Sequence, residues 1–232
     1  VTAIAFGVVA LGIGAIGLGA ASSHTITVDA DGGADYASIQ AAVDSATSGS
    51  TIEVQSGTYR ESVAVDKTIT IVAPNGATLN GSGLSGSPSG FVVSGQAAPD
   101  ISGFTITGYS QGFNAQEASG DWTLSDSTVK NNSFGAIRAD GSSGDWTIED
   151  SVIRDGLNDA VDAHDSTGDW TLRGSTVTNR IYAVNTSGQW TIDGVVVQER
   201  AGVTTPVAAV FEVRVVSPAE STTAAVVLRV GG

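Results

Sequence analysis

The sequence predicts an all-β protein built as a parallel β-helix, a solenoid in which short strands wind into stacked coils. A motif close to Ser-Gly-Asp-Trp-Thr recurs four times, and segments that alternate apolar and polar residues follow each copy. The 232 residues include 30 glycines and only 15% are charged, which favours strands and turns over a helical bundle. Repeats of about 20 to 50 residues indicate a solenoid, and coils this short that are made of strands fit a β-helix.

The repeat also predicts which residues lie above one another. Its tryptophans stand at positions 122, 146, 170 and 190, which are 24, 24 and 20 residues apart, so we expect a four-residue deletion near Arg180. Because successive coils stack strand on strand, we predict three inward ladders: Leu124, Ile148, Leu172 and Ile192; Val129, Ile153, Val177 and Val197; Ile137, Val161 and Val184. The tryptophans are interpreted as a fourth core ladder, with a sugar-stacking stripe as the alternative.

Residues 35–81 carry the features of the N-terminal coils. Asp35 is the predicted N-cap of a short helix that ends near Gly49, and short alternating strands follow it. The segments DYASIQAAVD and GTYRESVAV resemble the first coils of the pectin-lyase-like superfamily of right-handed parallel β-helix proteins. The resemblance implies that the helix caps the N-terminal end and that the β-helix covers residues 23–200.

Segments of a different character flank the predicted β-helix. Residues 1–21 carry no charge, and as a helix they would be about 31 Å long at about 1.5 Å per residue. A signal peptide, a membrane anchor and the core of a pilin-like filament all fit, and we predict that residues 1–22 are an anchor or assembly segment. Residues 201–232 contain two alternating runs around a turn, which predicts a β-hairpin that either caps the solenoid or offers an edge to another subunit.

The charge balance excludes some classes of partner. The chain has 24 acidic and 10 basic residues, a net charge of −14, so a nucleic-acid partner is not expected. It has no cysteine, which excludes disulfides, iron–sulfur clusters and cysteine-bound zinc within the chain. The acidic, lysine-poor composition resembles that of haloarchaeal proteins and predicts tolerance of concentrated salt. An ordinary acidic secreted protein is the alternative.

Two groups of acidic residues are candidate sites. Asp121, Asp145 and Asp169 recur with the motif, and we interpret them as either a solvated ridge or a site for calcium or another cation. The second group is Asp155, Asp159, Asp162 and His164. The pectin-lyase-like resemblance implies that paired carboxylates here could act as acid and base. An ion pair between coils, with Asp162 between Arg138 and Asn185, explains the same residues.

The leading functional prediction is an extracellular or cell-surface protein with a structural or adhesive role. Residues 1–22 would hold it in a membrane or a filament core, and residues 207–232 are a second candidate for self-association. Asn80, Asn131 and Asn185 each begin an Asn-X-Ser/Thr sequon, which agrees with an extracellular location and with attached glycans. The alternative is a polysaccharide lyase, a glycoside hydrolase or a carbohydrate-binding module. The catalytic signatures of the resembled superfamily are absent from the sequence, so we lean away from an enzyme, and we expect no cofactor apart from cations.

Overall fold

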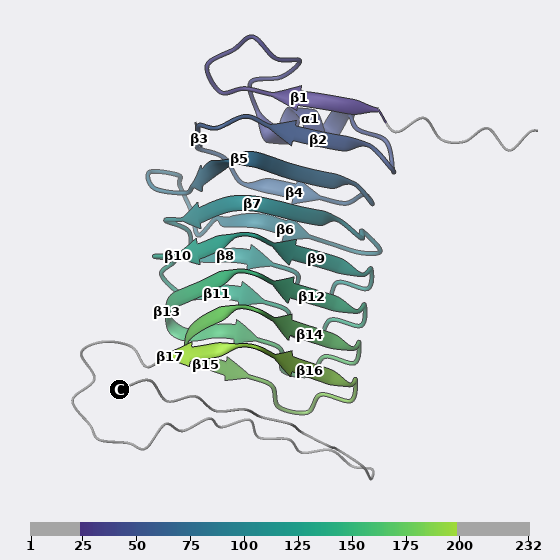
Figure 1. Cartoon of the computed structure of the whole chain (residues 1–232), viewed down its shortest axis with the longest axis vertical. Helices are drawn as coiled ribbons and strands as arrows, with labels where there is room; N and C mark the ends of the chain where they lie inside the picture. Colours follow the sequence, from purple (N-terminus) through teal and green to yellow (C-terminus); the bar gives the residue numbers. More distant parts are fainter. Residues whose placement is uncertain (1–23, 199–232) are drawn as a thin grey trace, which may run out of the picture.

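The computed structural model describes residues 24–198, which form an all-β parallel solenoid of about seven coils (Figure 1). Strands one coil apart pair in parallel along the rod. The strands are β1 (Thr25–Val28), β2 (Thr51–Val54), β3 (Thr58–Tyr59), β4 (Val63–Val65), β5 (Thr70–Asn80), β6 (Ser89–Val93), β7 (Asp100–Thr107), β8 (Gln111–Asn114), β9 (Trp122–Ser125), β10 (Thr128–Lys130), β11 (Gly135–Arg138), β12 (Trp146–Glu149), β13 (Val152–Asp162), β14 (Trp170–Arg173), β15 (Thr176–Tyr182), β16 (Trp190–Asp193) and β17 (Val196–Gln198).

Both flanking segments of the sequence, residues 1–22 and 201–232, lie outside the described residues. The anchor or assembly segment and the C-terminal hairpin therefore stay predictions. No helix among residues 24–198 has the length and the apolar character to span a membrane.

A single short helix, α1 (Ile39–Ser45), lies at the N-terminal end of the described solenoid and packs against β1, β2 and β4 (Figure 1). Its N-cap is Ser38, whose hydroxyl accepts a hydrogen bond from the backbone N–H of Ala41 at 3.3 Å. The prediction that Asp35 caps the helix is therefore wrong. The carboxylate of Asp35 instead accepts from the backbone N–H and the hydroxyl of Thr27, both at 2.8 Å, which ties the loop before the helix to β1.

The core consists of columns of apolar side chains, one residue from each coil. Strand register confirms the first two predicted ladders, since Leu124, Ile148 and Leu172 are fully buried in one and Val129, Ile153 and Val177 in the other. Ile192 continues the first ladder in register and is partly buried. Val197 continues the second in backbone register, but its side chain lies outside the described part of the chain.

The third predicted ladder needs a correction at its last member. Ile137 and Val161 pair as expected, but the next residue in register is Ile181 and not Val184. Arg154 and Val161, seven residues apart, pair with Thr178 and Ile181, which are only three apart. The shorter coil therefore loses its four residues beside Arg180, as the spacing predicted, and this shift brings Ile181 into the core.

The repeated tryptophans form a continuous stack inside the solenoid. Trp122, Trp146 and Trp170 are each 2% exposed. Neighbouring rings in this set lie 5.2 and 5.1 Å apart, centre to centre, and within 4° of parallel. Trp190 extends the stack at 5.8 Å and 17°. These indoles fill the core, and the three buried rings cannot serve as a stacking surface for sugars.

The glycine and the aspartate of the motif join one coil to the next. A Cβ atom on Gly144 would lie 2.2 Å from the carbonyl oxygen of Gly120, and one on Gly168 would lie 2.1 Å from that of Gly144. Only glycine allows two coils to approach this closely. Three successive residues of the motif therefore contact their equivalents in an adjacent coil: the glycine through its backbone, the aspartate through its carboxylate and the tryptophan through its indole ring.

Candidate functional site

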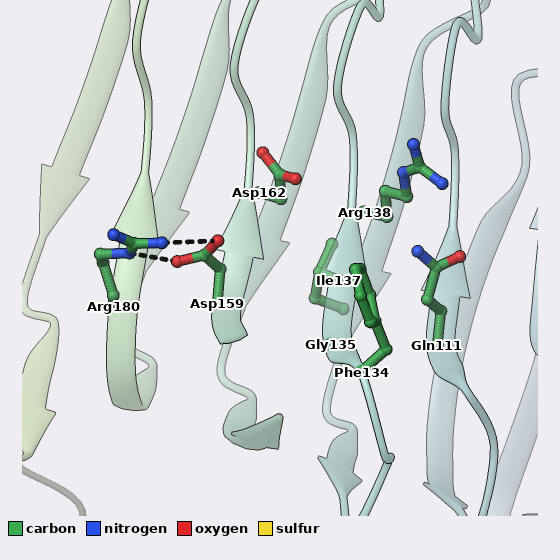
Figure 2. A pocket seen from close by; sticks show the side chains of 8 residues that line it. All are labelled: Gln111, Phe134, Gly135, Ile137, Arg138, Asp159, Asp162 and Arg180. Carbon is green, nitrogen blue, oxygen red and sulfur yellow. Dashed lines mark hydrogen bonds and ion pairs between the residues drawn. The ribbon is translucent and has the colours of Figure 1, made fainter. Parts of the chain in front are cut away.

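A shallow groove crosses the face of the solenoid formed by β8, β11, β13 and β15 (Figure 2). Parallel pairing in register places the outward residues of successive coils in columns, and one such column runs through Asn114, Arg138, Asp162 and Tyr182. Their neighbours along each strand, such as Val161 and Ile181, point into the core. The residues that line the groove are Gln111, Phe134, Gly135, Ile137, Arg138, Asp159, Asp162 and Arg180.

Both arginines of the groove are held by carboxylates of the same chain. Arg180 pairs with Asp159 through two hydrogen bonds, from Nε to Oδ1 and from Nη2 to Oδ2, the second at 3.1 Å (Figure 2). Arg138 donates from Nε to Oδ1 of Asp140 at 2.5 Å. The guanidinium carbon of Arg180 also lies 4.9 Å from the centre of the Tyr182 ring. These pairs neutralise most of the positive charge in the groove and fix the two side chains.

The predicted partners of Asp162 need correction. Asp162 lies in register between Arg138 and Tyr182, and not beside Asn185, because the deletion near Arg180 shifts the following coil. Arg138 bonds to Asp140 two residues along its own chain. The predicted ion pair between coils is therefore made by Asp159 and Arg180.

His164 lies just past the end of β13 and contacts Asp162. Its Nδ1 is 2.6 Å from Oδ1 of Asp162, and its Nε2 is 3.8 Å from Oδ2 of Asp165. Burial disfavours the charged ring, but the hydrogen bond to Asp162 and the charges of Asp162, Asp140 and Asp165 outweigh it, so the pKa of His164 is raised above its usual 6.5. A carboxylate that orients an imidazole in this way can prepare it to accept a proton.

The structure thus brings together part of the predicted acidic cluster. Asp159 and Asp162 line the groove, and His164 adjoins it through Asp162. The backbone of Asp155 lies in β13, but its side chain is outside the described part of the chain. The cluster's role in any reaction stays a prediction.

Sequence reasoning missed Phe134, which lines the groove and is 52% exposed. Its position is fixed by the turn before β11, where the backbone N–H groups of Phe134 and Gly135 both donate to the carbonyl of Ser110, at 2.8 and 3.2 Å. Phe134 lies between the repeated motifs and belongs to no ladder. One feature of the sequence could have identified Phe134: it is a large aromatic residue between Ser133 and Gly135, at a position that belongs to none of the predicted inward ladders.

The three aspartates of the motif form a ladder of hydrogen bonds. Oδ1 of Asp121 accepts from the backbone N–H of Asp145 at 2.8 Å, and Asp145 accepts from Asp169 in the same way at 2.8 Å. Asp169 accepts from the N–H of Gln189 at 2.7 Å. Within residues 24–198, no group of three or more His, Asp or Glu side chains is arranged to hold a metal ion. A cation site on this ridge stays a prediction, and the geometry gives the carboxylates a structural role that the sequence did not reveal.

A model described as "Family of unknown function (DUF7261)" matches residues 114–229, half of the chain. The protein belongs to the DUF7261 family. Among solved structures, the crystal structure of alginate lyase from Paenibacillus sp. str. FPU-7 is similar at a TM-score of 0.48, with 14% sequence identity and coverage of 76% of each chain. No curated protein sequence matches the chain.

The DUF7261 match contains most of the groove and all of the stacked tryptophans. It begins at Asn114, so Gln111 lies before it, and it continues to residue 229, past the last described coil. The family description assigns no function. One fold serves many functions, so the groove and its side chains, and not the solenoid, indicate what this protein does.

Two of the three sequons of this DUF7261 protein begin between strands, and the third begins at the last residue of β5. Asn131 and Asn185 are exposed and have positive φ angles of 54° and 58°. Asn80 is partly buried, and its Oδ1 accepts a hydrogen bond from the N–H of Ser82 at 2.9 Å. Glycosylation at these positions stays a prediction.

Proposed function

We propose that the protein is a structural or adhesive component of the cell surface that binds carbohydrate in the groove beside Phe134. The observation that carries the proposal is the exposed Phe134 ring next to the polar side chains of Gln111, Arg138 and Asp162. An aromatic face packs against the C–H groups of a sugar, while amide, guanidinium and carboxylate groups bond to its hydroxyls.

The pairing of charges in the groove favours a ligand rich in hydroxyl groups over a strongly charged ligand. Arg138 and Arg180 are each held by an aspartate, so neither presents an uncompensated positive charge. Ligand recognition would therefore depend on ring stacking and on hydrogen bonds with hydroxyl groups. A chain of sugars is the ligand class with both features.

The repeat supports the structural part of the proposal. In each copy of the motif the glycine, the aspartate and the tryptophan contact the equivalent residues of an adjacent coil. These contacts stabilise a rod, and the three side-chain positions are not available for catalysis. In this proposal residues 1–22 attach the rod to a membrane or a filament, on the outside of the cell. Deletion of residues 1–22 should then give a soluble monomer, while the intact chain sediments with membranes or as large assemblies. An intact chain that is itself a soluble monomer contradicts this attachment.

Affinity electrophoresis in gels that contain neutral or acidic polysaccharides tests the binding. We expect at least one polysaccharide to slow the protein, and Phe134→Ala to weaken that effect about tenfold, as loss of an aromatic contact of about 1 to 1.5 kcal/mol implies. Val196→Ala is the matched control, because Val196 is the other large apolar residue exposed in the described range. No retardation by any polysaccharide, or equal retardation of the Phe134 variant, overturns the proposal.

A polysaccharide-cleaving enzyme is the second candidate, and the contact between His164 and Asp162 favours it. An imidazole oriented by a carboxylate could take a proton from a sugar carbon or from water. Incubation with polysaccharides should then produce unsaturated or reducing ends, and His164→Gln should abolish them. If the intact protein produces neither, the enzyme candidate fails while the binding proposal stands.

A further inference from the structure

The last described coil leaves one edge of the solenoid uncovered. Within residues 24–198, β16 pairs with β14 and β17 pairs with β15, and neither strand has a partner on its other side (Figure 1). Trp190 and Ile192 are only partly buried, while Trp170 and Leu172 in the preceding coil are almost fully buried. An open strand edge beside apolar side chains is a site that proteins normally cover.

The same coil lacks the side chains that join each coil to the next. Asp169 gives way to Gln189 at the ladder position, so the series of carboxylates ends there. The hydroxyl of Ser175 accepts a hydrogen bond from the backbone N–H of Ser151 at 3.1 Å. The equivalent residue of the next coil is Val195, whose side chain has no acceptor. Whatever covers this end does not continue the repeat, yet it must present apolar side chains to Trp190 and Ile192.

We infer that residues 207–230 of the same chain cover this end, by pairing with the free edges of β16 and β17. The chain leaves β17 at Gln198 with 34 residues still to come (232 minus 198), more than the 20 to 24 of one coil. Phe211, Val213 and Val215 alternate with Glu212 and Arg214, so one side of that run is apolar. The family match spans the last coils and this segment as a single unit, from residue 114 to residue 229.

Two arguments favour this segment over a second copy of the chain. A covalently attached segment acts at an effective concentration of about a millimolar or more, far above that of a separate molecule. The opposite end of the solenoid also carries α1 beside β1, β2 and β4, so it does not offer a bare sheet for head-to-tail stacking. Pairing of two C-terminal ends is then the competing arrangement, and it depends on protein concentration.

Hydrogen–deuterium exchange on the intact chain tests the inference. In the earlier coils the backbone N–H of the repeated tryptophan donates to the following coil, so the N–H of Trp190 is the amide of β16 that a cover must accept. We expect this amide to be protected to the same degree at two protein concentrations that differ about tenfold, because cover by the chain itself is unimolecular. Exchange of the Trp190 amide at the rate of unstructured peptide overturns the inference. Protection that rises with concentration, together with a dimer in solution, also overturns it, in favour of a second copy.

Variants of the intact chain locate the cover. Val213→Asp should speed exchange in β16 about tenfold or more, while exchange in β12, two coils earlier in the tryptophan series, stays unchanged. Arg214→Asp is the matched control, since it places the same carboxylate on the polar side of the run, and its effect should be much smaller. If Val213→Asp does not fold, Val213→Thr keeps the shape and replaces one methyl group with a hydroxyl. Unchanged exchange in β16 in the folded variant contradicts the inference.

Discussion

The carboxylate of Asp145 accepts a hydrogen bond from the backbone N–H of Asp169, one coil further along the solenoid, at 2.8 Å. The same bond joins Asp121 to Asp145 and Asp169 to Gln189. A row of like charges is therefore held in place by neutral donors of the main chain, and each charge contributes to the contact between two coils.

Substitution of Asp145 separates the hydrogen bond from the charge. Asp145→Ala removes the acceptor and should lower the free energy of unfolding by about 1 kcal/mol. Asp145→Asn keeps an oxygen at the same position and should cost less, because it also relieves repulsion along the row. Denaturant unfolding measures both, and an equal loss in the two variants would show that the bond contributes nothing.

Salt should stabilise the fold. The chain carries a net charge of −14, and screening reduces the repulsion among carboxylates such as those of the ladder. We expect the thermal midpoint to rise between about 0.1 M and 2 M potassium chloride, a range over which the Debye length falls from about 10 Å to about 3 Å or less. A midpoint that stays flat or falls contradicts the expectation.

Gly168→Ala tests the close approach of the coils. The new Cβ would lie 2.1 Å from the carbonyl oxygen of Gly144, so the backbone must shift, and we expect a loss of about 1 to 3 kcal/mol in unfolding free energy. Gly57→Ala is the control, since its Cβ would meet nothing closer than 3.6 Å. Similar losses in the two variants would mean that the general cost of replacing a glycine by alanine in a bend, and not the contact with Gly144, determines the loss.

Ile148→Asp tests the inward ladder. Ile148 is fully buried between Leu124 and Leu172, so an aspartate there buries an unpaired carboxylate and should cost several kcal/mol, about 3 or more. Thr147→Asp, on the outward side of the same strand, should cost far less. Thermal unfolding of the two variants compares them, and a cost for Thr147→Asp that matches the other would refute the assignment of faces.

We expect the contribution of His164 to the free energy of unfolding to be lost as the pH rises. Its pKa is raised in the folded protein above the 6.5 of an unperturbed histidine, because its bond to Asp162 and the neighbouring carboxylates outweigh burial. The contribution is therefore fully present below about pH 6.5 and is lost as the pH rises through the folded pKa. The side chain is 34% exposed, so we expect less than about 1 kcal/mol between pH 6 and pH 8.5. His164→Gln should remove this slope in denaturant unfolding, and a slope that persists would assign it to other groups.

The repeats made the architecture predictable from the sequence, whereas the geometry of the corners and of the groove could not be predicted. Equal spacing of Trp122, Trp146 and Trp170 determines which residues stack, so the ladder through Ile148 followed directly from the sequence. Val184 was misplaced because a spacing gives the size of a deletion but not the exact residues at which the strands realign. The hydrogen bonds of the aspartates and the exposure of Phe134 depend on the path of the turns, which alternation of apolar residues does not specify.

The tryptophan stack gives the molecule an optical property of its own. Because the indole rings lie almost parallel at 5.1 to 5.2 Å, we expect their electronic transitions to couple, so that the near-ultraviolet circular dichroism reports on the row of rings and not on single rings. Because each ring sits in a different coil, separation of any two coils breaks the coupling between them. The protein thus contains an internal reporter of the distance between its coils, and that reporter extends from Trp122 to Trp190.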